Sequence, residues 1–275
     1  VNTVTGEEVS TMQLGHFNAF PLARDASKQN FGAIWWFGVK GDDLMKSIRT
    51  NPARPLVQVN HPRSGSFGSP FIKGYFSATG FDPATFTPRS TLDWSTDYDA
   101  IEIANGGSPG YEDWFAFLDR GYKVLATGNS DSHVARTDMV GYPRNYVLVG
   151  DDDPTKFSLT TFMERLRGGR LTVSGGWFVE ASAGDKLPGD VLASSAVPGG
   201  QLNLKVRVQA PAYVGAATGE VVVNGAVVDT FAVPASTEGA AIRLGEVREV
   251  TVPTGKDAWV VVRVTGGRLD PVLSS

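Results

Sequence analysis

Two features that many proteins depend on are missing from this sequence, which contains no cysteine and no long apolar run. Without cysteine, disulfide bonds, thiolate metal ligands and cysteine nucleophiles are excluded. The longest apolar stretches, such as residues 259–262, are no longer than a strand. A membrane-spanning helix needs roughly 18 such residues, so we expect no membrane span.

Positive charge and histidine are also scarce. Lys and Arg number 25 against 29 Asp and Glu, which gives a net charge of −4, and there are only 3 histidines. This balance argues against a nucleic-acid partner or an anionic membrane surface, because both attract strongly basic proteins. Apolar residues make up 41% of the 275 residues, enough for one large domain or two ordinary ones. The composition leaves the oligomeric state open.

The start of the chain lacks both Met and a visible signal peptide, because residue 1 is Val. We interpret the chain as a truncated or processed piece of a longer protein. A sequence without cysteine is compatible with export, so we expect an extracytoplasmic location, periplasmic or secreted, in a bacterium.

Residues 1–175 mix short apolar runs with helical patterns. Four runs lack clean polar alternation, as strands buried on both faces do: residues 57–60, 100–104, 124–127 and 146–149. Helices are predicted from apolar stripes formed by Leu44, Met45 and Ile48, by Tyr111, Trp114, Phe115 and Leu118, and by Leu159, Phe162, Met163 and Leu166. This alternation predicts an α/β domain with substantial parallel pairing. The aromatic residues Trp35, Trp36 and Phe37 are expected in its core.

The pattern changes after Gly175 and Gly176. Polar residues alternate with Leu202, Leu204, Val206 and Val208, as in a half-buried strand. Asn224 and Gly225 lie between two apolar runs, which is the strongest short signal for a β-hairpin. Further strands are predicted at 250–252 and 259–264. We therefore expect residues 176–275 to form a small all-β sandwich domain.

The three histidines lie beside small or polar residues, in turn-like or strand-end settings. His61 and the pair Asp131 and His133 each follow a predicted buried strand. Loops that leave the carboxyl ends of such strands carry the functional sites of α/β folds. An Asp-x-His sequence offers oxygen and imidazole ligands from one turn, as Zn²⁺, Mn²⁺ or Fe²⁺ sites require. From spacing alone, a metal site and ordinary hydrogen-bonded histidines are equal alternatives.

Five segments occur in an order that resembles the PHP (polymerase and histidinol phosphatase) superfamily of metal-dependent hydrolases. The order and composition of these segments are most similar to the carbaryl hydrolase-like branch of that superfamily. The resemblance covers residues 1 to about 175. The segments are Gly6-Glu7-Glu8-Val9-Ser10-Thr11, Gly15-His16-Phe17-Asn18, Asn60-His61-Pro62, Ala100-Ile101-Glu102-Ile103-Ala104-Asn105-Gly106 and Ser130-Asp131-Ser132-His133.

The resemblance implies a distorted (β/α)₇ barrel that binds two or three divalent metal ions (Zn, Mn or Fe). Glu8, His16 and His61 would share one ion; Glu7 is the neighbour most easily confused with Glu8. Asp131 would bind a second ion and His133 a third, and both are expected to be catalytic. The family's upstream His-x-His strand and Thr-Asp-His segment have no counterpart here, so we expect an incomplete barrel over 1–175 and little activity from this piece alone.

The resemblance also implies hydrolysis of a small-molecule phosphoester, or of a carboxylic or carbamic ester, by metal-activated water. On the substrate side, Arg63 is a candidate phosphate ligand, with a solvated loop arginine as the alternative. Asn105 is a candidate hydrogen-bonding residue, or simply a turn residue. The rival hypothesis is an exported binding or surface module with a catalytically inactive barrel.

Overall fold

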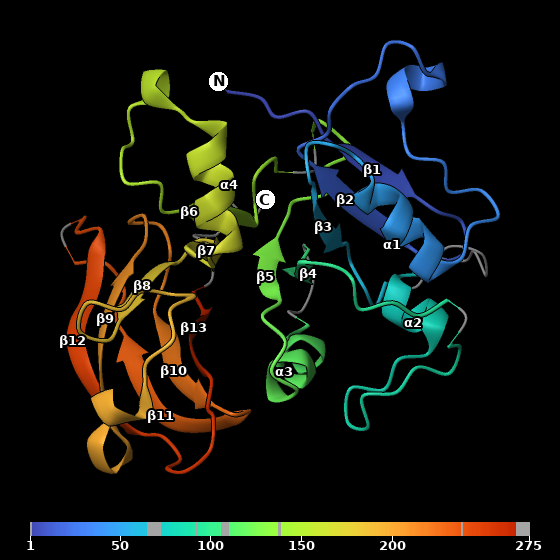
Figure 1. The fold of residues 1–275 in the computed structure, drawn as a ribbon. Helices are drawn as coiled ribbons and strands as arrows, with labels where there is room; N and C mark the ends of the chain where they lie inside the picture. The colour runs from blue at the N-terminus through green and yellow to red at the C-terminus, as the bar shows by residue number, and fades with distance from the viewer. Residues whose placement is uncertain are drawn as a thin grey trace. The chain divides into compact units, whose positions relative to one another are not determined.

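The computed structural model describes residues 2–64, 73–91, 93–105, 110–136, 139–237 and 239–267 (Figure 1). The chain divides into two compact units. The first consists of Val1–Asp131 with Gly150–Met163, and the second of Ser132–Val149 with Glu164–Ser275. The domain boundary expected after residue 175 falls inside the second unit, and as a boundary between folding domains it stays a prediction.

The first unit contains a five-stranded sheet in the order β1-β2-β3-β4-β5. Its strands are β1 (Glu7–Ser10), β2 (His16–Phe20), β3 (Leu56–Val59), β4 (Ala100–Ala104) and β5 (Leu125–Gly128). Strands β1, β2 and β3 pair antiparallel, whereas β3, β4 and β5 pair parallel. The expected strands at 57–60, 100–104 and 124–127 are therefore present, within one residue of the predicted bounds.

The two faces of this sheet differ in character. Side chains alternate between the faces of a strand, and the register places Val9, Phe17, Val59 and Ile101 on one face. These four belong to a single buried apolar core. The opposite face carries polar side chains: Glu8, His16, Asn18, Gln58, Asn60, Glu102 and Thr127.

Three helices pack against the apolar face. They are α1 (Gly41–Arg49), α2 (Tyr75–Thr79) and α3 (Tyr111–Asp119), and each contributes buried residues to the same core. The predicted stripe of α1 is confirmed, since Leu44, Met45 and Ile48 are fully buried. The stripe predicted for α3 is confirmed only in part: Tyr111 and Trp114 are partly buried against the core. The fully buried residues of this helix are Asp113, Ala116 and Phe117.

Two further sequence predictions concern the helix near residue 160 and the aromatic cluster at residues 35–37. Helix α4 (Leu159–Arg167) follows Ser158, whose hydroxyl oxygen accepts a hydrogen bond from the Thr161 N–H at 3.3 Å. The expected burial of the aromatic cluster is wrong for two of its members, because Trp35 and Phe37 are 70% and 66% exposed. Trp36 alone of the three packs against the core.

The expected (β/α)₇ barrel is wrong. The described residues form four sheets and no closed barrel, with 33% of them in strands and 18% in helices. Parallel pairing of neighbouring strands needs a long crossover, but only residues 11–15 connect β1 to β2, which therefore pair antiparallel. The strand expected at 146–149 is instead β6 (Arg144–Val147), which pairs with β7 (Leu171–Ser174) in a separate two-stranded sheet.

The second unit is dominated by two antiparallel three-stranded sheets, β11-β10-β13 and β12-β9-β8. Their strands are β8 (Phe178–Ser182), β9 (Gln201–Gln209), β10 (Ala217–Val223), β11 (Ala226–Val233), β12 (Ile242–Thr251) and β13 (Val260–Gly266). Both sheets contribute to one apolar core. Its members include Leu202, Leu204, Val206 and Val208, as the alternating pattern predicts.

The predicted hairpin at Asn224 and Gly225 is confirmed. These two residues connect β10 to β11 and have φ angles of 47° and 81°, as a type I′ turn requires. Short 3₁₀ turns complete the described elements: η1 (Gln29–Gly32), η2 (Pro154–Lys156), η3 (Ser194–Ala196) and η4 (Pro198–Gly200). No helix in the described part of the chain has the length and apolar character of a membrane span.

Candidate metal centre

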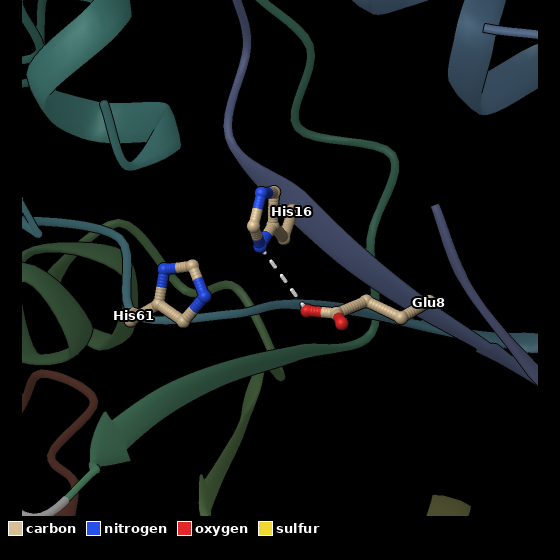
Figure 2. Close-up of side chains that lie close together, drawn as sticks. All are labelled: Glu8, His16 and His61. Carbon is tan, nitrogen blue, oxygen red and sulfur yellow. Dashed lines mark ion pairs between the residues drawn. The ribbon is translucent and has the colours of Figure 1, made fainter. Parts of the chain in front are cut away.

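Three side chains of ligand type converge on the polar face of the five-stranded sheet (Figure 2). Glu8 lies in β1, His16 begins β2, and His61 lies two residues beyond the end of β3. One possible ligand atom from each residue lies within 4.8 Å of the others. Nδ1 of His16 is 3.3 Å from Oε1 of Glu8, and the two imidazole rings meet edge to face with centroids 4.9 Å apart.

The backbone of the β1–β2 hairpin positions the first two ligands. Ser10 pairs with His16 and Glu8 with Asn18, so Glu8 and His16 point to the same face on adjacent strands. Gly15 precedes His16 with φ 81°, and a Cβ atom there would lie 2.7 Å from the backbone nitrogen of Tyr75. Only glycine tolerates both conditions, so this residue lets the hairpin approach α2 closely.

The third ligand is brought in by the end of β3. The Asn60 N–H donates to the carbonyl oxygen of His16 at 3.0 Å, which ties the residue before His61 to β2. His61 itself has φ 28°. A positive φ is uncommon for a residue with a side chain and costs conformational energy. The chain turns sharply at His61, and the His61 imidazole lies beside that of His16.

Glu8 is held in its charged form. The pKa of Glu8 is lowered to about 2, mainly by the hydrogen bond with His16. The Asn60 amide and the charges of His16 and His61 also lower this pKa, whereas partial burial raises it. Nδ2 of Asn60 donates to Oε1 of Glu8 and to Oδ1 of Asn18, both at 3.0 Å. The carboxylate is therefore ionised and oriented at neutral pH.

His61 is held in its neutral form. Burial lowers the pKa of His61, the charge of His16 lowers it further, and the carboxylates of Asp131 and Glu8 partly oppose this. Nδ1 lies 3.0 Å from the hydroxyl oxygen of Ser64. The other ring nitrogen points toward Glu8 and His16 (Figure 2). A histidine must be neutral to bind a metal ion, so this environment suits a ligand.

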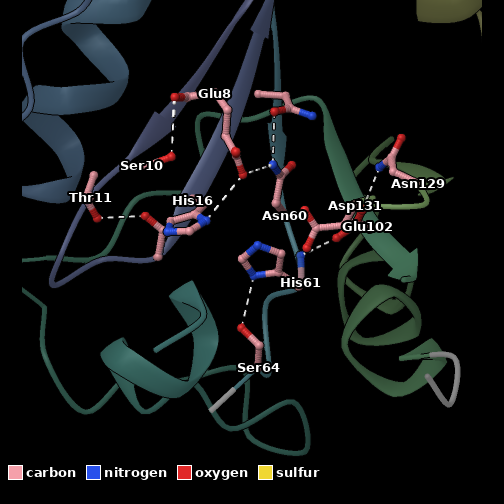
Figure 3. A network of polar contacts seen from close by, with 12 residues as sticks. Glu8, Ser10, Thr11, His16, Asn60, His61, Ser64, Glu102, Asn129 and Asp131 are labelled. Atoms are coloured by element: carbon pink, nitrogen blue, oxygen red, sulfur yellow. Dashed lines mark hydrogen bonds and ion pairs between the residues drawn. The ribbon is translucent and has the colours of Figure 1, made fainter. Parts of the chain in front are cut away.

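A second carboxylate, Glu102, lies beside His61 (Figure 3). It is 3% exposed and accepts hydrogen bonds from the His61 N–H at 2.5 Å and from Nδ2 of Asn129 at 2.7 Å. Nδ2 of Asn105 also donates to Glu102, at 3.1 Å, and to Oδ2 of Asp131, at 3.3 Å. Burial is the main influence on Glu102 and raises its pKa, whereas these three donors act in the opposite direction.

Sequence reasoning did not identify Glu102, Asn60 or Asn129 as site residues. A signal was present for Glu102, because a carboxylate in the middle of the apolar run 100–104 is almost never buried without partners. Asn60 directly precedes the predicted ligand His61, and Asn129 lies two residues before Asp131. Both follow the end of a strand. Neither position differs from that of an ordinary turn asparagine in the sequence alone.

The other predicted site residues have different surroundings. Nε and Nη2 of Arg63 donate to the two carboxylate oxygens of the buried Asp113, at 2.8 and 2.5 Å. The substrate role of Arg63 stays a prediction, and the structural alternative now has a specific partner. Asp131, with φ 47°, ends the first segment of the first unit. His133 belongs to the second unit, so its part in the centre stays a prediction.

The three converging residues fit a divalent cation. Zn²⁺ binds imidazole nitrogen and carboxylate oxygen at about 2.0–2.2 Å, so tetrahedral ligand atoms of one ion are roughly 3.3–3.6 Å apart. The 3.3 Å between His16 and Glu8 matches this spacing. The full 4.8 Å span requires a small inward rotation of a side chain. Two histidines and one glutamate form the ligand set of several catalytic zinc sites, which leave a fourth position for water.

A hollow adjoins Glu8 at the β1–β2 edge of the sheet. Its volume is about 420 Å³, and it is lined by Val4, Gly6, Glu7, Glu8, Asn18, Ala19, Phe20 and Phe162. Most of its wall is apolar, and Glu7, Glu8 and Asn18 are its polar lining residues. It is therefore suited to the apolar part of a small molecule.

Comparison with known protein families, with curated proteins and with solved structures found no match. The chemistry of the site itself, together with the ordered motifs of the sequence, therefore carries the assignment of function.

Proposed function

We propose that this chain is the metal-binding part of a hydrolase in which Glu8, His16 and His61 hold a divalent cation, Zn²⁺, Mn²⁺ or Fe²⁺. The observation that supports this most directly is the convergence of three ligand atoms within 4.8 Å, from segments up to 53 positions apart. The order of its motifs resembles the PHP superfamily, and we propose membership of it. The closed barrel of that family is not part of this proposal.

The residues around the cation have separate tasks. Glu8, His16 and His61 would hold a divalent cation, which would supply an activated water and polarise the bond to be cleaved. Glu8 contributes a negative charge, which Asn60 orients, and His61 contributes a neutral imidazole. The hollow beside Glu8 is suited to the apolar part of the substrate. Asp131, joined to Glu102 through Asn105, is the candidate for a second ion or for proton transfer.

The proposed substrate is a small-molecule ester, either a phosphoester or a carboxylic or carbamic ester. A phosphoester requires cationic groups to neutralise its charge, and Arg63 already pairs with Asp113. A neutral ester requires only the cation and the apolar wall of the hollow. Comparing the two substrate classes therefore also tests the role of Arg63.

The test measures hydrolysis of p-nitrophenyl phosphate and p-nitrophenyl acetate after metal removal and after addition of Zn²⁺ or Mn²⁺. We expect only weak activity from this chain, which a chelator abolishes and metal restores. Glu8→Gln should lose it, whereas Glu7→Gln should retain metal binding, because Glu7 accepts a hydrogen bond from the Ile34 N–H at 3.0 Å and faces away from the histidines.

Two outcomes would count against the proposal. Activity that is equal with and without metal would remove the cation from the reaction. Tight metal binding without turnover of either substrate class would instead support the alternative hypothesis, a non-catalytic binding module.

A further inference from the structure

We propose that Glu102 is a positioning residue of the metal centre: it holds His61 through the backbone and Asp131 through Asn105. This inference rests on the proposed function, since it concerns how a ligand of that centre is placed. Glu102 lies on the same face of the sheet as Glu8 and His16 but is not one of the three converging residues. It belongs to strand β4, next to β3, and its carboxylate lies beside the backbone of His61 (Figure 3).

The contacts of Glu102 are made by three N–H donors. Oε2 accepts from the His61 N–H at 2.5 Å and from Nδ2 of Asn105 at 3.1 Å, and Oε1 accepts from Nδ2 of Asn129 at 2.7 Å. Donors therefore face both oxygens of one side chain that is 3% exposed. A carboxylate accepts at both oxygens, whereas the amide of a glutamine of the same size has only one acceptor oxygen, so the chemical identity of this residue matters as well as its size.

The backbone conformations at the ends of this network need such support. His61 and Asp131 have φ angles of 28° and 47°. Residues with side chains adopt this region at an energetic cost, and they remain there only when the surroundings hold them. Both residues are joined to Glu102, His61 by its own N–H and Asp131 by Asn105. The carboxylate thus fixes the two strand-end turns from which the candidate ligands project.

A purely structural role is the alternative, and the chain contains a matched example of it. Asp99 lies just before β4, and its Oδ2 accepts from the Val57 N–H at 2.7 Å and from Nη1 of Arg49 at 2.7 Å. Asp99 therefore joins β4 to the backbone near the start of β3, whereas Glu102 joins β4 to the backbone just beyond the end of β3. Asp99 has no hydrogen bond to a candidate ligand among the bonds of the described residues.

The experiment compares the wild-type chain with Glu102→Gln and Asp99→Asn. Zinc affinity is measured by competition with a chromophoric chelator, the Co²⁺ form is examined by visible absorption, and thermal unfolding is recorded without metal. We expect Glu102→Gln to lower zinc affinity about ten- to a hundredfold, the effect typical of residues that orient a ligand, and to change the Co²⁺ spectrum. Asp99→Asn should lower the melting temperature but leave both metal readouts unchanged.

Two results would overturn the inference. If Glu102→Gln and Asp99→Asn lower the melting temperature alike and neither changes affinity or spectrum, Glu102 is structural. If the wild-type chain binds no zinc or cobalt, the proposed function fails and this inference fails with it. Should Glu102→Gln not fold, Glu102→Asp keeps the charge but withdraws it from His61. We expect the same loss of affinity, and unchanged zinc affinity in Glu102→Asp would contradict the inference.

Discussion

At the scale of single residues, polar side chains gather on one face of the five-stranded sheet. Glu8 contacts His16 and Asn60, Asn60 also donates to Asn18, and Glu102 accepts from the backbone of His61. A low pKa at Glu8 and a lowered pKa at His61 prepare both for a cation, because metal ligands must be deprotonated. The same shifts make the metal-free protein sensitive to acid.

The stability of the metal-free chain should therefore fall as the pH falls. The pKa of His61 in the folded state lies below its ordinary value of 6.5. The folded state thus takes up the proton less readily than the unfolded chain, and stability is lost as the pH falls from about 6.5 through the folded pKa. Glu8, with a pKa of about 2 instead of 4.5, adds a second loss between these two values.

The measurement is a series of urea unfolding curves from pH 8 to pH 3 in the presence of a chelator, with an NMR titration of the His61 ring. The variant His61→Gln should show a flatter slope between pH 7 and pH 5. A ring pKa at or above 6.5 would contradict the account of His61.

Arg63 should prove important for the fold. Arg63→Ala leaves the carboxylate of Asp113, whose side chain is 5% exposed, without its charged partner. Because the guanidinium is itself 40% exposed, the expected loss is moderate, about 2–3 kcal/mol in the free energy of unfolding. Chemical denaturation measures it, and the double variant Arg63→Met with Asp113→Leu should recover most of it.

The same variant also tests the substrate hypothesis. Equal losses of activity on phosphate and neutral esters would make Arg63 structural. A loss confined to phosphoesters, with unchanged unfolding free energy, would instead favour the phosphate-binding role over the ion pair with Asp113.

At the scale of secondary structure, features that depend on neighbouring residues were predictable, and features that depend on tertiary contacts were not. The hairpin at Asn224 and Gly225 depends on two adjacent residues, and the stripe of α1 on one helical turn. The face of α3 was not predictable, because Phe115 and Phe117 are equally apolar and the tertiary contacts of Phe76, Phe81 and Tyr98 with Phe117 decide between them.

The hairpin provides a prediction about backbone conformation alone. Gly225 has φ 81° and open space around it, so Gly225→Ala meets no steric obstacle and suffers only the left-handed conformation, about 1–2 kcal/mol. Gly245 in β12 is the matched control, with equally open space and no left-handed φ. Thermal and chemical unfolding should show Gly225→Ala destabilised and Gly245→Ala unchanged or slightly stabilised. Equal effects would contradict the assigned turn.

At the scale of the whole molecule, the sequence predicted that Glu8, His16 and His61 lie together, but it did not predict the architecture around them. His16 and His61 were proposed as ligands from short motifs, and their role as metal ligands stays a prediction. The barrel was wrong because closure depends on how many strands pair in parallel, and β1 and β2 pair antiparallel. Glu102 was missed because two of its three donors, His61 and Asn129, come from other segments, which only the folded chain brings together.

The central claim is that one divalent cation binds between Glu8, His16 and His61. Anomalous diffraction at the zinc edge, from crystals of the zinc-loaded chain, tests it most directly. The account predicts an anomalous peak about 2.0–2.2 Å from one carboxylate oxygen and two imidazole nitrogens, and no such peak in Glu8→Gln crystals. A zinc-loaded crystal with its ion elsewhere and these three side chains unligated would contradict the account.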